Sequence, residues 1–259
     1  MVFDQDEFVH LLTDYYQFCN RVFWHCTVRQ APLGGWPSIT PESLAGLAKN
    51  DIVIDLLRHV PYVDYPEQDI LACKPIIMDH TTIIDYRSEE THKRVQNKIE
   101  DYTEPYNNGH PPIPPSCACI ATRLSRNGYF VAVDTDDGYI YCGDPNGQHD
   151  EPPTDLNLFL KQYNNDAANE WRACGVNVYR PADFFAFCKQ RFLELRWIGL
   201  GQWHMEALRM NDEWDDDGNE KHWELANKMK EAGWPGDGEG GGWDRAKFEA
   251  TVNEDETEE

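Results

Sequence analysis

The chain has 259 residues, 41% of them hydrophobic, and a formal net charge of −23. That length and apolar content allow a core of ordinary size, whereas the negative charge repels phosphate backbones, so we expect no nucleic-acid partner. Uncharged apolar runs such as 129–133 are far shorter than the roughly 20 residues of a membrane helix. The acidic N-terminus lacks the features of a signal peptide. We therefore expect no membrane partner and a location in the cytosol or nucleus.

Two helical regions are predicted in the first 60 residues. Apolar residues recur every three or four positions from 6 to 29, which predicts a long first helix with one buried face. The proline- and glycine-rich segment 31–37 ends that helix. Thr40, followed by proline, predicts the start of a second helix. A helical pattern continues through 51–59 and stops before Pro61.

The middle of the chain changes from helical to extended patterns. Residues 75–86 are rich in isoleucine and threonine and predict one strand, or two strands with a kink at 79–80. Residues 88–102 are polar and fit either a solvated helix or a mobile excursion. Residues 111–115 contain four prolines and predict a stiff extended connector.

The clearest pattern is a three-stranded antiparallel meander. Strand-like runs cover 118–124, 128–134 and 139–142. They are separated by Asn127-Gly128 and Asp137-Gly138, dipeptides that supply the positive φ of tight hairpins. Helices predicted at 154–163 and 182–197 need a sheet to cover. The expected fold is α+β, a mainly antiparallel sheet with the meander flanked by helices, in a single domain over 1–210.

Residues 211–259 form a distinct acidic extension. They contain 17 Asp and Glu against 5 Lys and Arg, a net charge of −12. A helix closed by Gly233 is predicted at 219–232. A flexible link at 236–242, a short helix at 243–252 and a disordered tail complete the prediction.

Three groups of residues have the composition of chemical sites, but each is better explained as part of the fold. The acidic turn 134–138 lacks the remaining ligands of a calcium loop, and Asp side chains also stabilise plain β-turns. A zinc site would need Cys117 and Cys119 to be joined by His110 or His149, which no sequence rule brings close. A thiol nucleophile would combine Cys142 with Asp144 and His149, but it also needs a lowered pKa and a fixed base geometry, which residue types alone do not supply. Buried thiols are the simpler reading. We predict no metal, no cofactor and no catalytic residue.

Loop tryptophans are the remaining candidates for contact with other molecules. Large aromatic side chains in loops often anchor interfaces. They also dock an extension onto its own domain, and the sequence leaves both readings open. The tryptophans in or beside loops and the extension are Trp36, Trp203, Trp214, Trp223, Trp234 and Trp243, and Trp36, Trp203 and Trp234 are selected as candidate contact residues.

An alternative hypothesis is a small-molecule enzyme or ligand-binding protein. It places a pocket between the 51–59 helix and the sheet, with polar groups from Arg58, His59, His80 and Asp85. Arg58 and His59 are also ordinary residues for a helix C-terminus, where the dipole favours cations.

The run 128–134, the run 137–141, a polar loop and the segment 156–163 together resemble the central signature of the SUKH superfamily. That family includes yeast cell-wall-synthesis regulators and bacterial toxin-immunity proteins. The resemblance implies an antiparallel sheet flanked by helices and a non-catalytic role in binding other proteins. Segments 53–62 and 231–235 are similar to a large set of fungal proteins with no established activity.

The favoured hypothesis is therefore a regulatory or protein-interaction module. Its binding surface is expected at the sheet edge or at the loops 134–138 and 144–153, with the extension as a second contact. A basic protein fits the charge of the chain, and the oligomeric state is left open. The expected contact residues are Asp134, Asp136, Asp137, Tyr139, Tyr141, Trp36, Trp203 and Trp234.

Overall fold

Six short strands form the central sheet of the computed structural model, which describes residues 2–65, 75–97, 113–124, 128–143, 176–201, 204–208 and 219–258. The strands lie in chain order: β3 (Ile76–Met78), β4 (Thr81–Ile83), β5 (Cys117–Arg123), β6 (Phe130–Asp134), β7 (Ile140–Gly143) and β8 (Val176–Tyr179). Each strand is antiparallel to its neighbours. The predicted α+β class is confirmed, and so is the central meander of β5, β6 and β7.

The turns of the sheet follow local sequence signals. Gly138 has φ +78° at the turn between β6 and β7, as the Asp-Gly dipeptide predicts. The isoleucine-rich segment 75–86 forms two strands, with His80 at φ +47° in the turn between them. All residues of β6 and β7 are buried. Because alternate strand residues point to opposite faces, both faces of these strands are covered.

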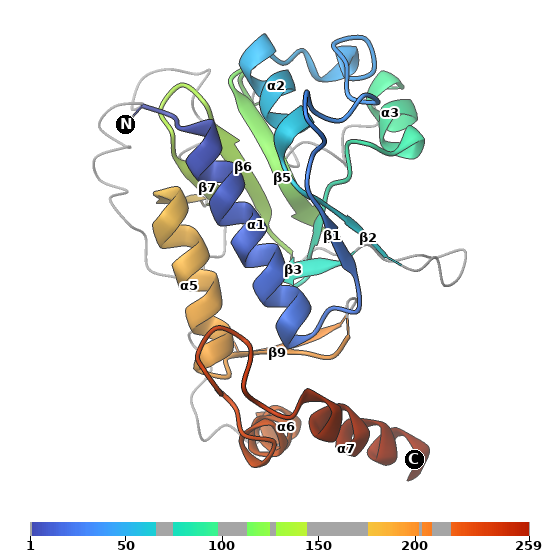
Figure 1. Ribbon diagram of the computed structural model, residues 1–259, viewed down its shortest axis with the longest axis vertical. Coiled ribbons are helices and arrows are strands. Elements are labelled where there is room, and N and C mark those ends of the chain that lie inside the picture. The colour runs from blue at the N-terminus through green and yellow to red at the C-terminus, as the bar shows by residue number, and fades with distance from the viewer. Residues whose placement is uncertain are drawn as a thin grey trace.

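Two helices lie side by side across one face of the central sheet (Figure 1). They are α1 (Gln5–Val22) and α5 (Pro181–Leu193). The ring of Tyr15 on α1 lies 5.4 Å from that of Phe185 on α5. Trp24, just after α1, donates a hydrogen bond of 2.8 Å from Nε1 to the carbonyl of Ile76 in β3. Aromatic packing joins the two helices, and the bond from Trp24 attaches the helical layer to the sheet.

A smaller group of elements lies above α1 and to its right in Figure 1. It comprises a two-stranded sheet, a 3₁₀ turn and two helices, with bounds β1 (Thr27–Arg29), β2 (Tyr62–Asp64), η1 (Ala45–Leu47), α2 (Asp51–His59) and α3 (Glu89–Gln96). The α2 prediction is confirmed, with Asn50 accepting a 2.9 Å bond from the N–H of Val53 as N-cap. For the segment that begins at Ser88, the helical alternative is the one observed.

The first helix is shorter than its apolar periodicity predicted. It ends at Val22, and Thr27–Arg29 instead pair with β2, with Val28 opposite Val63. The prediction to residue 29 was wrong because pairing with a strand more than 30 residues away overrides a helical pattern at its frayed end.

Two other helix predictions were also wrong in extent. Thr40 and Ser43 do hydrogen-bond each other's backbone N–H groups as at a helix start, but only one turn and the short η1 follow. The helix predicted to Trp197 ends at Leu193. Leu195 then has φ +56°, and Trp197 begins a new strand. The segments 98–112, 144–175 and 209–218, which include the predicted helix 154–163 and the loop 144–153, lie outside the described residues.

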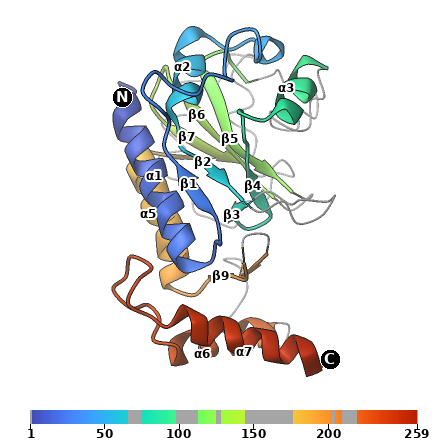
Figure 2. The same ribbon diagram turned by 45° about the vertical axis from the view of Figure 1, so that its right-hand side comes forward.

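The C-terminal elements gather at the end of the molecule opposite α2 (Figures 1 and 2). They are the hairpin of β9 (Trp197–Gly199) and β10 (Met205–Ala207), then α6 (Glu220–Glu231) and α7 (Arg245–Glu258). The two helices predicted in the extension are thereby confirmed. The helix α7 continues through the acidic residues predicted to be a disordered tail, since glutamate is a good helix former. In the part of the chain that is described, no helix has the length and apolar character to span a membrane.

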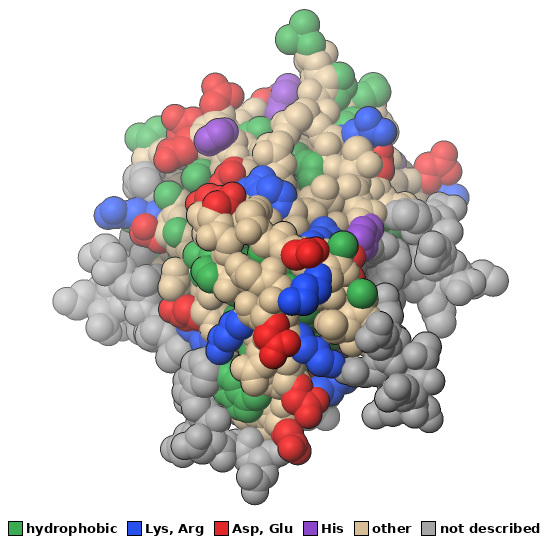
Figure 3. All heavy atoms as spheres, turned by 60° about the horizontal axis from the view of Figure 1, so that its bottom comes forward, with side chains coloured by type: hydrophobic (Ala, Val, Ile, Leu, Met, Phe, Trp, Pro, Cys, Tyr) green, Lys and Arg blue, Asp and Glu red, His purple; other side chains and the backbone are tan. Residues whose placement is uncertain are grey.

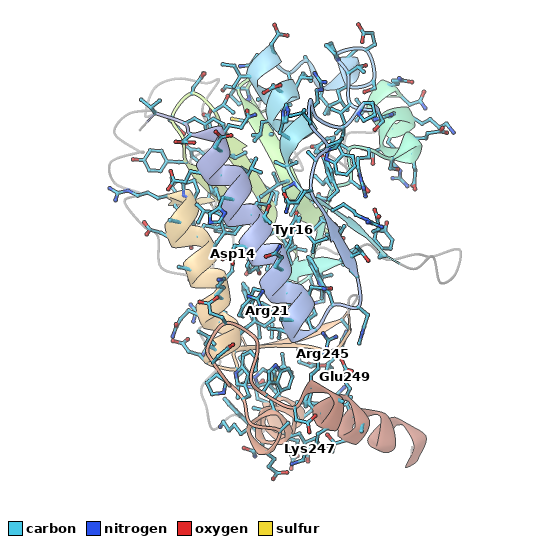
Figure 4. All side chains as sticks on the ribbon, in the orientation of Figure 1. Asp14, Tyr16, Arg21, Arg245, Lys247 and Glu249 are labelled. Carbon is cyan, nitrogen blue, oxygen red and sulfur yellow. The ribbon has the colours of Figure 1, made fainter. Side chains whose placement is uncertain are left out.

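The extension is docked on the rest of the chain rather than joined through an open link. Within residues 236–242, Oδ1 of Asp237 accepts bonds of 2.8 and 2.9 Å from two backbone N–H groups of the loop, which closes it into a turn. Glu239 in this loop pairs with Lys189 of α5 at 2.7 Å. Arg245 at the start of α7 donates a 2.8 Å bond to the carbonyl of Asn20 in α1. Figure 4 shows Arg245 and Glu249 beside the end of α1 that carries Arg21.

Candidate functional site

The turn between β6 and β7 holds five of the residues predicted to bind a partner. Asp134 is buried, and its Oδ1 accepts a 3.0 Å bond from the N–H of Asp136. Asp137 accepts a 2.9 Å bond from the N–H of Tyr139 and a 2.5 Å bond from the hydroxyl of Tyr141. Asp136 is the exposed side chain of the five. These hydrogen bonds therefore fix the turn, and the carboxylate of Asp136 is exposed to solvent.

The carboxylates of this turn stabilise its backbone, and this use agrees with the plain β-turn that the sequence favoured. Within the described ranges, no group of three or more His, Cys, Asp and Glu side chains is arranged to hold a metal ion. Cys117, Cys119 and Cys142 are buried in strands of the central sheet. Their proposed partners His110, Asp144 and His149 lie outside the described residues.

Trp36 was predicted to bind a protein partner and Asp85 to line the alternative pocket, but both contact the guanidinium of Arg87. The carbon Cζ of Arg87 lies 4.8 Å from the ring centre of Trp36 and 5.1 Å from that of Tyr62. Its Nη2 donates a 2.8 Å bond to Asp85. Trp36 in turn donates from Nε1 to the carbonyl of Val60 at 3.0 Å. Arg87 was not selected from the sequence, although an aspartate two residues before it at a strand end is a local pairing signal.

Arg87 extends this contact into a chain of alternating charges. Its Nη1 lies 2.9 Å from Asp64, which also accepts a 2.8 Å bond from Arg29. Burial works to raise the pKa of Asp64, but the bonds and charges of Arg29 and Arg87 outweigh it and hold the pKa below its usual value. The charges join β1, β2 and the end of β4, which is a role in assembling the fold.

Trp234 is buried within the extension. Its Nε1 donates a 3.3 Å bond to the carbonyl of Leu193 at the end of α5. Its ring meets Trp243 edge-on at 5.1 Å. The indole is thus used in docking the extension on its own domain, whereas Trp203 lies outside the described residues.

The four polar residues of the alternative pocket do not converge. Arg58 donates a 2.6 Å bond to the carbonyl of Gly34, and His59 contacts the carbonyl of Asp55 at 2.8 Å. His80 lies in the turn between β3 and β4, half exposed, with its Nε2 3.7 Å from the carboxylate of its neighbour. Asp85 is paired with an arginine, as described above.

A small cavity does lie beside α2, where that hypothesis expected one. Its volume is about 10 Å³, and its walls include Tyr16 of α1, Leu57 of α2 and Ile120 of β5. The position of Tyr16 is shown in Figure 4. Such a space holds about one water molecule, whereas small-molecule sites measure roughly 300–1,000 Å³. This cavity is too small for a substrate.

Two of the described thiols, Cys19 and Cys26, have pKa shifts opposite to those of a nucleophile. Burial raises the pKa of Cys26 to about 11, and it raises the pKa of Cys19 as well. A reactive cysteine needs the opposite shift, because the thiolate is the attacking species.

One feature was not evident from the sequence: exposed carboxylates from three elements gather at the end of the molecule that carries the N-terminus. A Cβ placed on Gly138 in the β6–β7 turn would lie 3.3 Å from Cα of Phe3, so the N-terminal segment rests on that turn. Nε2 of Gln5 donates a 2.9 Å bond to Asp55 of α2, which joins the third element. We call this surface the acidic end. Its carboxylates are Asp4, Asp6, Glu7, Asp51, Asp55 and Asp136, all exposed.

Five of these carboxylates make no ion pair with the residues that the structure describes, namely Asp4, Asp6, Glu7, Asp51 and Asp136. The opposite end differs. Viewed from that side, basic and acidic side chains are interleaved over α6 and α7 (Figure 3). The acidic end is therefore a group of exposed carboxylates, most of which have no ion-pair partner among the described residues.

Comparison of the chain with models of protein families, with curated proteins and with solved structures returned no match.

Proposed function

We propose that the protein is a non-catalytic, SUKH-like interaction module that binds a basic protein partner through the acidic end. The observation that carries this proposal is the group of exposed carboxylates that α1, α2 and the β6–β7 turn bring together. A surface with one sign of charge attracts oppositely charged partners and accelerates their association. Asp136 belongs both to this surface and to the turn that resembles the family signature.

The use of the other polar residues supports binding rather than catalysis. The carboxylates of Asp134, Asp137 and Asp85 accept hydrogen bonds from within the chain. General acid–base catalysis needs such a group to face a substrate with a suitable pKa. The uncompensated charges lie instead on an open surface, which suits a macromolecular partner.

The proposal is tested with a charge-neutral triple variant, Asp6→Asn, Glu7→Gln and Asp136→Asn. Each exposed ion pair contributes about 0.5 kcal/mol, so losing three lowers the affinity for the partner by about tenfold. The control changes three exposed glutamates of α6, Glu220→Gln, Glu224→Gln and Glu231→Gln. It alters the net charge equally at the other end of the molecule.

The measurement is affinity capture from an extract of the source cells with the wild type and both variants. We expect a stoichiometric basic protein that the wild type and the α6 variant retain and the acidic-end variant loses. Raising the salt concentration should weaken its capture, because salt screens exposed charges. Recovery of chaperones alone, together with a monomeric wild type at every concentration in gel filtration, would end the proposal.

A further inference from the structure

The segment that follows β1 forms a tight turn with a leucine at its tip. The N–H of Gly35 donates a 2.8 Å bond to the carbonyl of Pro32, which closes a four-residue turn. Gly34 occupies the third position with φ +88°, the geometry of a type II turn. Leu33 therefore takes the second position, from which a side chain points away from the turn.

This turn is held at several points by α2 and the residues after it. Nη2 of Arg58 donates a 2.6 Å bond to the carbonyl of Gly34. The N–H of Trp36 donates a 2.9 Å bond to the carbonyl of Arg58, and its indole is fixed between Val60 and the guanidinium of Arg87. A Cβ on Gly35 would lie 2.9 Å from Cβ of Arg58, so the turn sits directly on the helix.

Leu33 gains nothing from folding, because its side chain is fully exposed (108% of the reference area). Single exposed apolar residues are common on protein surfaces. What distinguishes Leu33 is the support under it, since a fixed backbone removes much of the ordering cost that an interface residue otherwise has. A rigid, fully exposed leucine has the properties of an anchor that fills a pocket on another molecule.

The turn is continuous with the acidic end through α2. The ring of His59 lies 3.3 Å from a Cβ placed on Gly35, and its Nδ1 is 3.4 Å from a carboxylate oxygen of Asp55. Asp55 belongs to the acidic end and binds Gln5. On the same exposed face of α2, Ile52 precedes Asp55 by three residues and is 53% exposed. An apolar tip and a carboxylate surface thus share one side of the molecule.

We infer that Leu33 is the apolar anchor of the proposed interaction, inserted into a leucine-sized pocket that Lys and Arg side chains border on a basic partner. The charge of the acidic end specifies the basic border, and the shape of the turn specifies the pocket. This inference rests on the proposed function. It adds the contact that slows dissociation of the complex, because most differences in affinity between related complexes lie in the dissociation rate.

The first test replaces Leu33 with alanine and repeats the capture experiment. We expect at least tenfold weaker binding of the partner, because burial of a leucine side chain is worth roughly 1.5–3 kcal/mol. The control is Leu124→Ala, which shortens another exposed leucine at the far end of β5. Thermal unfolding of Leu33→Ala should match that of the wild type, since the side chain contacts nothing in the fold.

The second test places the photoreactive residue p-benzoylphenylalanine at position 33, with the same residue at position 124 as its control. Irradiation in extract should join position 33 to the captured protein, and mass spectrometry should map the link to apolar residues flanked by Lys or Arg. A link no stronger than that from position 124, or one to a surface without basic neighbours, overturns the inference.

The two proposals fail in different ways. If the acidic-end variant loses the partner while Leu33→Ala keeps it, the anchor is refuted and the proposed function stands. If neither variant changes the capture, both are refuted.

Discussion

Replacing Trp234 with alanine removes the indole through which the extension packs on the domain. The side chain is 5% exposed, meets Trp243 at 5.1 Å and donates a hydrogen bond to the carbonyl of Leu193. Truncating a buried tryptophan costs about 3–5 kcal/mol, from lost burial and the cavity left behind. Since whole domains are stable by only about 5–15 kcal/mol, the loss should be large.

Urea denaturation followed by circular dichroism measures this loss. With a slope of about 3 kcal/mol per M for a protein of this size, the midpoint should fall by about 1 M or more. The variant Trp234→Phe keeps much of the apolar contact but loses the hydrogen bond, so it should cost about 1–2 kcal/mol. It therefore separates packing from bonding.

The result that would refute this reasoning is an unchanged midpoint for Trp234→Ala. An extension that unfolds in a separate early transition, with the domain transition unaltered, would refute it equally. Either outcome would mean that the contacts of Trp234 add nothing to the stability of the domain.

Three further predictions concern the backbone and the titrating groups. Gly35→Ala should cost about 2–3 kcal/mol in urea denaturation, because positive φ is unfavourable for alanine and the new Cβ would approach Arg58. The hydrogen bond to Glu206 raises the pKa of His204. The stabilisation that protonated His204 gives the fold is therefore full below its unfolded pKa and is lost as the pH rises through the raised pKa. The difference in melting temperature between wild type and His204→Gln should vanish at alkaline pH. Backbone N–H groups lower the pKa of Asp237, so the wild type should lose its advantage over Asp237→Ala as the pH falls through that lowered value, and equal acid sensitivity of the two proteins would contradict this.

Local signals were sufficient where the structure depends on neighbouring residues. The N-cap Asn50, the proline after α2 and the Asp-Gly turn between β6 and β7 act over a few residues, and the elements they predict are observed. Five strands escaped prediction, β1, β2, β8, β9 and β10. Each has three or four residues, too few for a periodic pattern to stand out.

For the candidate residues as well, local sequence signals identified single residues but not their long-range contacts. The sequence identified Asp136 and Trp36 individually, but nothing in their neighbourhoods indicated that Asp136 lies beside the start of α1 or that Trp36 stacks on Arg87. Leu33 was seen only as part of a helix-breaking segment. Its importance as a proposed anchor depends on the bond from Arg58, a residue 25 positions away.

By itself, the amino-acid sequence determined the α+β composition, the central meander, the helices α2 and α6 and the acidic character of the chain, because hydrophobic period, caps and turn dipeptides act through local geometry. Only the tertiary structure decided which charges remain uncompensated. Arg29, Arg87 and Lys189 neutralise carboxylates distant in sequence, whereas no Arg or Lys among the described residues pairs with the carboxylates of the acidic end. Long-range pairing of this kind depends on how packed elements bring side chains together, and no pattern along the chain encodes it.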